Sequence, residues 1–266
     1  MTDHASPTKP SDGVCWVTGA SSGIGEALAK RLVKQGWTVI VSARSAEKLD
    51  ALVSTAPDKM FAAPLDIADF DRVDEVVAAI EEQHGPIARA VLNAGIYVSV
   101  NAETADFESY KRCIGVNLTG TAACVAALTP RFAKRRSGQL VLVSSATGFG
   151  GMPTSSAYGA TKAGLINMAE SLRIELDRYG VLVQCVTPGF VETPAQDDNA
   201  FPKPFMISAE SAARRMANGM KTRGFELTFP KRFTWMLKLI YALPRTWHIN
   251  LVRRQTGWNK PIEDES

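Results

Sequence analysis

A tyrosine and a lysine four residues apart, Tyr158 and Lys162, are the pair in this sequence best suited to proton transfer. If the segment is helical, the phenol and the ammonium lie one turn apart on the same face. A phenol has a pKa of about 10 in water, and a neighbouring cation should bring that pKa closer to neutral pH. Such a pair could protonate a carbonyl oxygen or deprotonate an alcohol. Taken alone, it also fits an ordinary surface helix with a solvated lysine.

A glycine-rich stretch, Gly19 to Gly25, lies between a predicted strand and a predicted helix near the start of the chain. The strand is expected at 14–18 and the helix at 26–35. This arrangement brings a pyrophosphate against backbone N–H groups at a helix N-terminus. The glycines are spaced G-x-x-x-G-x-G, and a tight turn without a ligand is the alternative interpretation.

The rest of the chain alternates between short apolar runs and amphipathic stretches. Further strands are predicted at 38–43, 60–65, 88–92, 140–143, 181–186 and 225–229, and further helices at 68–83, 104–132 and 155–179. This alternation predicts an α/β fold, a single Rossmann-type doubly wound parallel sheet of about seven strands flanked by helices, with a helical C-terminal extension. Ligands of such sheets bind beyond the carboxyl ends of the strands. Residues at those ends are therefore expected to gather on one edge: Gly19, Arg44, Asp66, Asn93, Ser145 and Pro188.

The residue after the second predicted strand indicates which dinucleotide binds. An acid there would select NAD, but this chain has Arg44 and no acid until Glu47. A guanidinium pairs well with a 2′-phosphate, so NADP(H) is the preferred cofactor, with help from Ser42 or Ser45, and NAD(H) remains possible. A solvated arginine at a helix start is the alternative.

Taken together, these motifs resemble those of the short-chain dehydrogenase/reductase family over residues 13–195. The matching residues are Thr18-Gly19-x-x-x-Gly23-x-Gly25, Asn93-Ala94-Gly95, Asn117, Ser145, Tyr158-x-x-x-Lys162, and Pro188-Gly189 with Thr193. The resemblance implies that Tyr158 is the general acid or base and that Ser145 stabilises the substrate oxygen. It implies that Lys162 lowers the phenol pKa and binds the nicotinamide ribose, and that Asn117 holds a water linking Lys162 to solvent.

The resemblance also implies which residues contact cofactor and substrate. Cofactor contacts are expected from Gly19, Ser21, Ser22, Gly23, Ile24, Gly25, Arg44, Asp66, Ile67, Asn93, Ala94, Gly95, Tyr158, Lys162, Pro188, Gly189 and Thr193. Asp66 is expected at the adenine edge, and Asn93 is expected to tie the central strands together. Substrate contacts are expected from Tyr97, Phe149, Met152 and Phe190, with residues 190–207 forming an irregular lid. Such an apolar pocket favours a hydrophobic carbonyl, unless these side chains only pack the loops.

Composition limits the other functional classes. The chain has 266 residues, 45% hydrophobic and 21% charged, with a net charge of +3 that is too small to indicate nucleic-acid binding. Its four cysteines and three histidines lack metal-ligand spacing, so no metal site is expected. Reduced cysteines favour a cytoplasmic protein, and no run reaches the length of a membrane-spanning helix. The predicted organisation is a disordered tail at 1–12, a Rossmann-fold domain at 13–230, and an amphipathic helical extension with a polar tail at 231–266.

The extension interleaves apolar and basic residues from Lys231 to Arg254, and Pro244 divides it into two helical pieces. Three interpretations stay open: it covers the substrate cleft, lies on a membrane surface, or docks on a partner subunit.

The leading hypothesis is an NADP(H)-dependent oxidoreductase that transfers a hydride between nicotinamide and a carbonyl or secondary alcohol on a hydrophobic small molecule. One alternative is a membrane-peripheral reductase of a lipid-like keto substrate, with peripheral membrane contact through 231–254. Another is a non-catalytic NADP(H)-binding regulator, against which the four intact residues Asn117, Ser145, Tyr158 and Lys162 argue. The resemblance also implies a homodimer or homotetramer.

Overall fold

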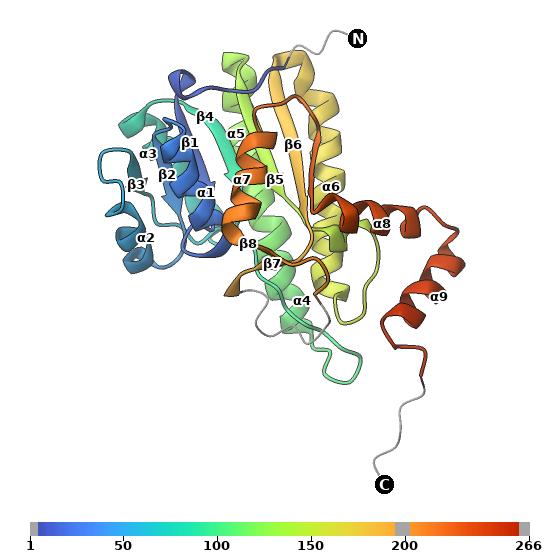
Figure 1. The fold of residues 1–266 in the computed structure, drawn as a ribbon. Coiled ribbons are helices and arrows are strands. Elements are labelled where there is room, and N and C mark those ends of the chain that lie inside the picture. Colours follow the sequence, from blue (N-terminus) through green and yellow to red (C-terminus); the bar gives the residue numbers. More distant parts are fainter. Residues whose placement is uncertain (1–4, 195–202, 261–266) are drawn as a thin grey trace.

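The computed structural model describes residues 5–194 and 203–260, and its centre is a seven-stranded parallel sheet. The strands are β1 (Val14–Thr18), β2 (Val39–Ser42), β3 (Met60–Ala62), β4 (Ile87–Leu92), β5 (Gly138–Val143), β6 (Val181–Pro188) and β9 (Glu226–Phe229). Their order across the sheet is β3-β2-β1-β4-β5-β6-β9 (Figure 1). A second, two-stranded sheet pairs β7 (Val191–Glu192) with β8 (Ile207–Ser208). The prediction of a doubly wound α/β fold is confirmed.

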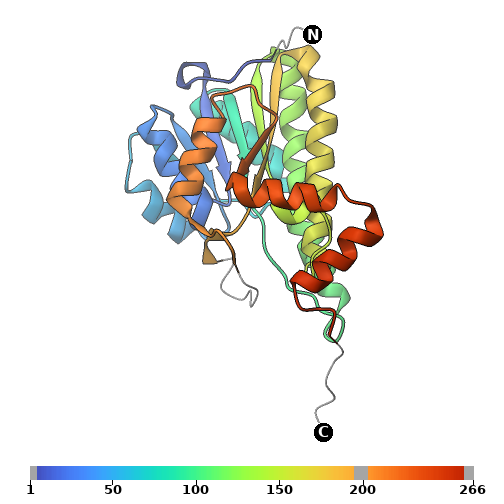
Figure 2. The same ribbon diagram turned by 45° about the vertical axis from the view of Figure 1, so that its right-hand side comes forward.

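Helices cover both faces of the large sheet, which explains why its central strands are buried at every position. One face is covered by α1 (Gly23–Lys34), α2 (Ala46–Val53) and α7 (Ala209–Gly219). The other is covered by α3 (Phe70–His84), α5 (Thr121–Arg135) and α6 (Ser156–Leu176). Figure 2 shows the two helical layers on either side of the sheet. The sequence pattern did not predict α2, α7 or the β7–β8 pair.

The strand order reverses between β1 and β4. The chain runs outward from β1 to β3, returns beside β1 as β4, and then runs outward in the opposite direction to β9. The loops after β1 and β4 therefore separate at this point and leave room for a ligand beyond the carboxyl ends of the strands.

The start of the chain differs from the predicted disordered tail over residues 5–12. Ala5 is buried, and both the backbone N–H and the hydroxyl of Thr8 donate to Gln139 Oε1 of β5. Arg89 of β4, also buried, donates through Nη2 to the carbonyl oxygen of Thr8 at 2.7 Å. This segment binds the amino ends of the central strands, the end of the sheet opposite to the glycine-rich turn.

A continuous helical stretch from Phe107 to Arg135 is long and apolar enough to span a membrane by length and composition. The prediction that no run reaches that length is therefore wrong. The stretch consists of α4 (Phe107–Ile114), a π-helical turn (Gly115–Gly120) and α5. Buried side chains of α5, such as Leu128 and Phe132, lie in the core beneath the sheet, as in any helix that covers a sheet face.

The C-terminal extension forms two helices, as predicted, with Pro244 between them. These are α8 (Lys231–Tyr241) and α9 (Arg245–Gln255). They extend from one side of the molecule, and α9 lies farthest from the sheet (Figures 1 and 2).

Candidate active site

Tyr158 and Lys162 lie one turn apart on α6, and both side chains reach the carboxyl edge of the sheet. Lys162 Nζ lies 5.6 Å from the centroid of the Tyr158 ring and donates to the carbonyl oxygen of Val143 at 3.0 Å. The edge of Tyr97 contacts the Tyr158 ring, with 5.1 Å between centroids. The spacing therefore positions the pair as the sequence predicts.

Burial, rather than the neighbouring cation, controls the pKa values of this pair. Loss of hydration raises the pKa of Tyr158 to about 12, and a hydrogen bond with Ser145 opposes the rise. Burial lowers the pKa of Lys162 to about 8, because the charged ammonium loses hydration. The expected lowering of the phenol pKa by Lys162 is therefore not found, because burial raises that pKa instead.

Ser145 follows β5 and begins a short 3-10 turn (Ala146–Phe149). Its hydroxyl accepts a hydrogen bond from the backbone N–H of Thr147 at 3.2 Å and donates to the Thr147 hydroxyl at 3.3 Å. The turn therefore holds the Ser145 hydroxyl within hydrogen-bonding reach of the Tyr158 side chain.

Asn117 is fully buried in the π-helical turn and braces the loop after β4. Its Oδ1 accepts from the Ile96 N–H at 2.7 Å, and its Nδ2 donates to the Ile96 carbonyl oxygen at 2.9 Å. A Cβ on Gly95 would lie 3.2 Å from Asn117 Oδ1 and 3.3 Å from Lys162 Nζ. Glycine at position 95 therefore lets the loop pass close to both side chains.

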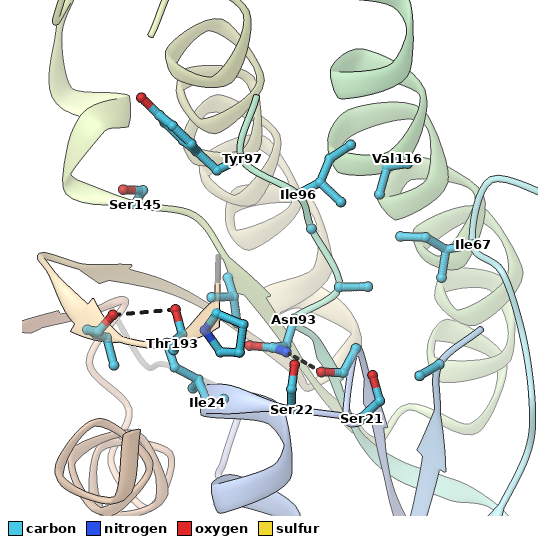
Figure 3. A pocket seen from close by; sticks show the side chains of 18 of the residues that line it. Ser21, Ser22, Ile24, Ile67, Asn93, Ile96, Tyr97, Val116, Ser145 and Thr193 are labelled. Atoms are coloured by element: carbon cyan, nitrogen blue, oxygen red, sulfur yellow. Dashed lines mark hydrogen bonds between the residues drawn. The ribbon is translucent and has the colours of Figure 1, made fainter. Parts of the chain in front are cut away.

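A cavity of about 640 Å³ lies beyond the carboxyl ends of β1, β2 and β4 (Figure 3). The glycine-rich turn forms its floor: Gly19 and Gly23 have φ of +65° and +56°, and a Cβ on Gly19 would lie 2.6 Å from Ala94 Cα. Ser22, the N-cap of α1, makes no side-chain capping bond, so the helix N-terminus opens toward the cavity. The glycine-rich turn and the start of α1 form a cradle that fits a pyrophosphate. Its oxygens would accept hydrogen bonds from the free backbone N–H groups in the first turn of α1.

The far end of this cavity is basic. Arg44, Ser45 and Lys48 line it, and Lys48 was not predicted from the sequence. Ser42 does not take the supporting role suggested for it, because its buried hydroxyl bonds Trp16 Nε1 and the Ala63 carbonyl. Lys48 lies in the first turn of α2 (Ala46–Val53), just after Arg44 and the N-cap Ser45, so predicting that helix would have drawn attention to it.

Most of the predicted cofactor contacts line the same cavity. They are Gly19, Ser21, Ser22, Gly23, Ile24, Arg44, Ile67, Asn93, Ala94, Gly95, Tyr158, Lys162, Pro188, Gly189 and Thr193. Asn93 also ties β4 to β1, since its Nδ2 donates to the carbonyl oxygens of Thr18 and Gly19 at 3.1 Å.

Three predicted contacts line neither this cavity nor the apolar one beside it. Asp66 instead accepts from the Ala68 N–H at 3.0 Å. Gly25 is needed for close approach within the turn, because a Cβ there would lie 2.2 Å from the Gly19 carbonyl oxygen. Phe149 packs with the α8 side chains, and Lys238 Nζ lies 5.2 Å from its ring centroid.

A second cavity of about 460 Å³ meets the first at Ser145 and Tyr158. Tyr97, Ser145, Tyr158 and Gly189 line both cavities. Met152 and Phe190, predicted substrate contacts, line the second cavity, whereas residues 195–202 of the predicted lid lie outside the described residues. The C-terminal extension supplies the remaining wall, as one of its three interpretations expected, although none of these residues was singled out from the sequence: Phe233, Met236, Leu237, Ile240, Leu251 and Val252 of α8 and α9.

The inner face of α8 is anchored beside Ser145. Phe233 and Leu237 pack on Ala146, and the Tyr241 hydroxyl donates to the Gly151 carbonyl oxygen at 3.0 Å. Lys238 forms an ion pair with Glu226 at the start of β9. These contacts favour the interpretation in which the extension covers the substrate cleft.

Among residues 5–194 and 203–260, no group of three or more His, Cys, Asp or Glu side chains could hold a metal ion. Within this part of the chain, the phenols of Tyr97 and Tyr158 and the hydroxyl of Ser145 line both cavities, and the ammonium of Lys162 lines the first one beside Tyr158. These can bind a carbonyl oxygen and transfer a proton to it.

Comparison with known proteins agrees with this chemistry. A family model described as short chain dehydrogenase matches residues 13–202. An uncharacterized oxidoreductase of Myxococcus xanthus is 35% identical over 86% of this chain and 91% of its own length. A 3-oxoacyl-acyl-carrier-protein reductase of Thermotoga maritima is 38% identical over 68% of this chain and 75% of its own. The crystal structure of an actinorhodin polyketide ketoreductase variant with NADPH is 26% identical, with a TM-score of 0.75, covering 84% of this chain and 97% of that one.

Proposed function

Because the chain belongs to the short-chain dehydrogenase family of oxidoreductases, we propose that it transfers a hydride between NADP(H) and a carbonyl or secondary alcohol on a hydrophobic small molecule. One observation carries the proposal: Ser145 and Tyr158 line both the cavity beside the glycine-rich turn and the second, apolar cavity. A dinucleotide in the first and a ketone in the second would meet at the two side chains able to manage the carbonyl oxygen.

The chain's own residues bind, orient and protonate the substrate. When bound, the nicotinamide cofactor supplies the hydride. Tyr158, whose pKa of about 12 keeps its proton at neutral pH, donates that proton to the carbonyl oxygen, and Ser145 donates a hydrogen bond to the same oxygen. Lys162 holds the nicotinamide ribose, and Asn117 holds the loop that borders both groups.

The preference for NADP(H) over NAD(H) is supported by the basic end of the cradle. Arg44 and Lys48 both line it, and a 2′-phosphate there would meet two cations. The polyketide ketoreductase with NADPH has the same fold.

The proposed substrate is a lipophilic carbonyl compound. Apolar side chains dominate the second cavity, so a polar acid would lose hydration there with few partners. By their names, two relatives act on 3-oxoacyl groups and a polyketide, which are keto compounds carried on larger molecules. A lipid-like keto compound is therefore the sharper candidate, and exposed aromatic side chains on α8 and α9 favour a membrane-peripheral enzyme.

We extend the proposal to organisation and location. The boundaries at 13–230 and 231–266 separate the sheet domain from the α8–α9 extension. Phe107, Ile114 and Ile174 are large exposed apolar residues on α4 and α6, which supports a homodimer or homotetramer formed through these helices. Four buried, free cysteines suit a cytoplasmic location.

The decisive experiment compares NADPH with NADH binding and then measures NADPH oxidation with ketones ordered by lipophilicity. Turnover that rises with lipophilicity supports the proposal. Tight NADPH binding without turnover across the panel would instead favour a non-catalytic regulator, and failure to bind either nucleotide would exclude both functions.

A further inference from the structure

The outer surface of α8, α9 and the turn that follows exposes an unusual number of large apolar side chains. Trp235 is 56% exposed, Leu239 69% and Trp247 66%, and Ile249 and Trp258 are also exposed. The chain's two other tryptophans, Trp16 and Trp37, are buried in the sheet core. Tryptophan prefers the interface between water and lipid, where its ring is partly buried and its N–H stays hydrated.

The same segment is strongly basic. From 227 to 260 the sequence has seven lysines and arginines and no aspartate or glutamate. The whole chain has a net charge of only +3, so the rest of the molecule is net negative. Lys238 is paired with Glu226, but Arg232, Arg253 and Arg254 are exposed on the outer surface. The acidic residues 263–265 lie outside the described residues.

The inner and outer faces of these helices are chemically separate. Phe233 and Leu237 of α8, like Leu251 and Val252 of α9, face the apolar cavity. On α8, Trp235 and Leu239 are four residues apart and therefore share the outward face. Trp235, Leu239 and Trp247 line neither cavity, so these three exposed side chains are not needed to close the apolar cavity, whereas the half-exposed Met236 is part of its wall.

A second copy of this chain fits the surface poorly. A two-fold contact would place each basic segment against its own copy, with like charges facing each other across the interface. An anionic lipid surface complements both features, since headgroups attract arginine and lysine while the acyl boundary accepts tryptophan and leucine.

We propose that the outer surface of α8 and α9 docks on an anionic lipid bilayer, so that the apolar cavity receives its substrate from the membrane. This inference rests on the proposed function only for the nature of the substrate. The docking itself depends on Trp235, Leu239 and Trp247 together with Arg232, Arg253 and Arg254.

The test is sedimentation of the full-length protein with phosphatidylcholine vesicles, with or without roughly one quarter phosphatidylglycerol, at about 0.1 M salt. Binding is expected only with phosphatidylglycerol and is expected to weaken at high salt. The double variant Arg253→Glu/Arg254→Glu should lose binding on the order of thirtyfold or more, since each cation near the surface contributes about fivefold. Trp235→Ala/Trp247→Ala should also bind more weakly.

Matched controls separate docking from general charge and exposure effects. Arg214 and Arg215 of α7 are likewise adjacent and exposed, so Arg214→Glu/Arg215→Glu makes the same change in net charge elsewhere. Phe70→Ala removes an exposed aromatic side chain from α3 instead. Both controls should bind vesicles like wild type. The proposal would be overturned if the protein bound neither kind of vesicle, or if Arg214→Glu/Arg215→Glu lost as much binding as Arg253→Glu/Arg254→Glu. It would also be overturned if the protein bound no vesicles but associated with itself, and Arg253→Glu/Arg254→Glu abolished that association.

Failure of docking and failure of the proposed enzyme are distinguishable. NADPH oxidation with a water-soluble apolar ketone is measured without vesicles, where Arg253→Glu/Arg254→Glu should match wild type because neither side chain lines a cavity. Turnover without vesicle binding would reject docking alone. Vesicle binding without turnover would leave docking standing and reject the enzymatic function.

Discussion

At the scale of single residues, the site depends on a buried phenol beside a buried ammonium. Tyr158 and Lys162 are both removed from water, and their pKa values shift in opposite directions, to about 12 and about 8. Both shifts favour the neutral forms, because burial penalises charge. A tyrosine that keeps its proton is suited to act as the acid in carbonyl reduction.

Replacing Tyr158 by phenylalanine tests its role as the acid. The ring keeps its packing against Tyr97, but the donor hydroxyl is lost. We expect kcat for ketone reduction to fall on the order of 10²–10⁴-fold, with NADPH binding unchanged, as measured by stopped assays and by nucleotide fluorescence. A variant that retains more than a tenth of wild-type kcat would assign the proton to another group.

Replacing Lys162 by methionine should stabilise the cofactor-free protein while abolishing turnover. At pH 7 the buried ammonium opposes folding, so its removal should raise the free energy of unfolding by about 1–3 kcal/mol. Loss of the hydrogen bond from Lys162 to the Val143 carbonyl oxygen should offset part of this gain. Denaturant titrations at pH 7 measure this change.

The pH dependence of the same titrations follows from the direction of the shift. The pKa of Lys162 is lowered from 10.5 to about 8 on folding, so between these values Lys162 binds more protons in the unfolded chain and its own contribution to stability rises with pH. The advantage of the methionine variant should therefore shrink between pH 8 and pH 10. Above pH 10 the raised pKa of Tyr158 acts in the opposite sense and stability falls. A constant difference across this range would show that Lys162 is solvated.

At the scale of elements, the short turn after Ser145 and helix α8 determine the shape of the substrate cavity. The ring of Tyr241 lies directly over Gly150, where an added Cβ would lie 2.2 Å from the ring, whereas a Cβ on Gly151 would meet nothing within 4 Å. These neighbouring glycines provide a matched pair of variants.

Gly150→Ala should displace α8 and loosen the apolar wall, whereas Gly151→Ala should not. For long apolar ketones we expect KM to rise on the order of tenfold in Gly150→Ala, because a bulky clash costs about 1–3 kcal/mol, with little change for a small ketone. Steady-state kinetics on both ketones measure the difference. Equal KM changes in the two glycine variants would contradict a role for α8 in substrate binding.

The start of α2 gives a second element-scale prediction, on cofactor choice. Arg44→Asp should weaken NADPH binding on the order of ten- to a hundredfold and improve NADH binding, since a carboxylate repels the 2′-phosphate and accepts ribose hydroxyl groups. Titration with both nucleotides tests this, and Lys48→Gln should show a smaller loss with NADPH only. Unchanged selectivity in both variants would place the 2′-phosphate elsewhere.

At the scale of the whole molecule, stability and chemistry are separated to opposite ends of the sheet. The site lies at the carboxyl ends of the strands, while residues 5–12 bind the amino ends through Thr8, Arg89 and Gln139. The guanidinium of Arg89 is buried, so it needs its acceptors.

Deleting residues 1–9 should therefore lower stability without altering the site. Loss of the Thr8 carbonyl removes an acceptor from a buried cation, which should cost about 1.5–3 kcal/mol in the free energy of unfolding. Thr8→Val keeps that carbonyl and should cost less. Chemical denaturation and KM for NADPH are the measurements. A large change in KM with unchanged stability would contradict this separation.

Much of this architecture could be predicted because the signals are local. Alternating apolar runs and amphipathic stretches predicted the seven strands, the covering helices α1, α3, α5 and α6, and the break at Pro244, but not α2 or α7. Parallel strands share their carboxyl ends, so the residues after them, from Gly19 to Pro188, were expected on one edge, and most of them line one cavity there.

The sequence by itself thus determined the fold, the family and which side chains stand at the strand ends, because these depend on the spacing of residues along the chain. Only the tertiary structure decided that α8 and α9 form the wall of the second cavity and that Lys48 lines the first cavity together with Arg44. In the same way it decided that Asp66 binds the Ala68 N–H and that Phe149 packs against α8, so that neither lines these cavities. It also decided the direction of the Tyr158 pKa. Burial and contact between distant segments depend on how the elements pack, and no spacing rule within one segment specifies them.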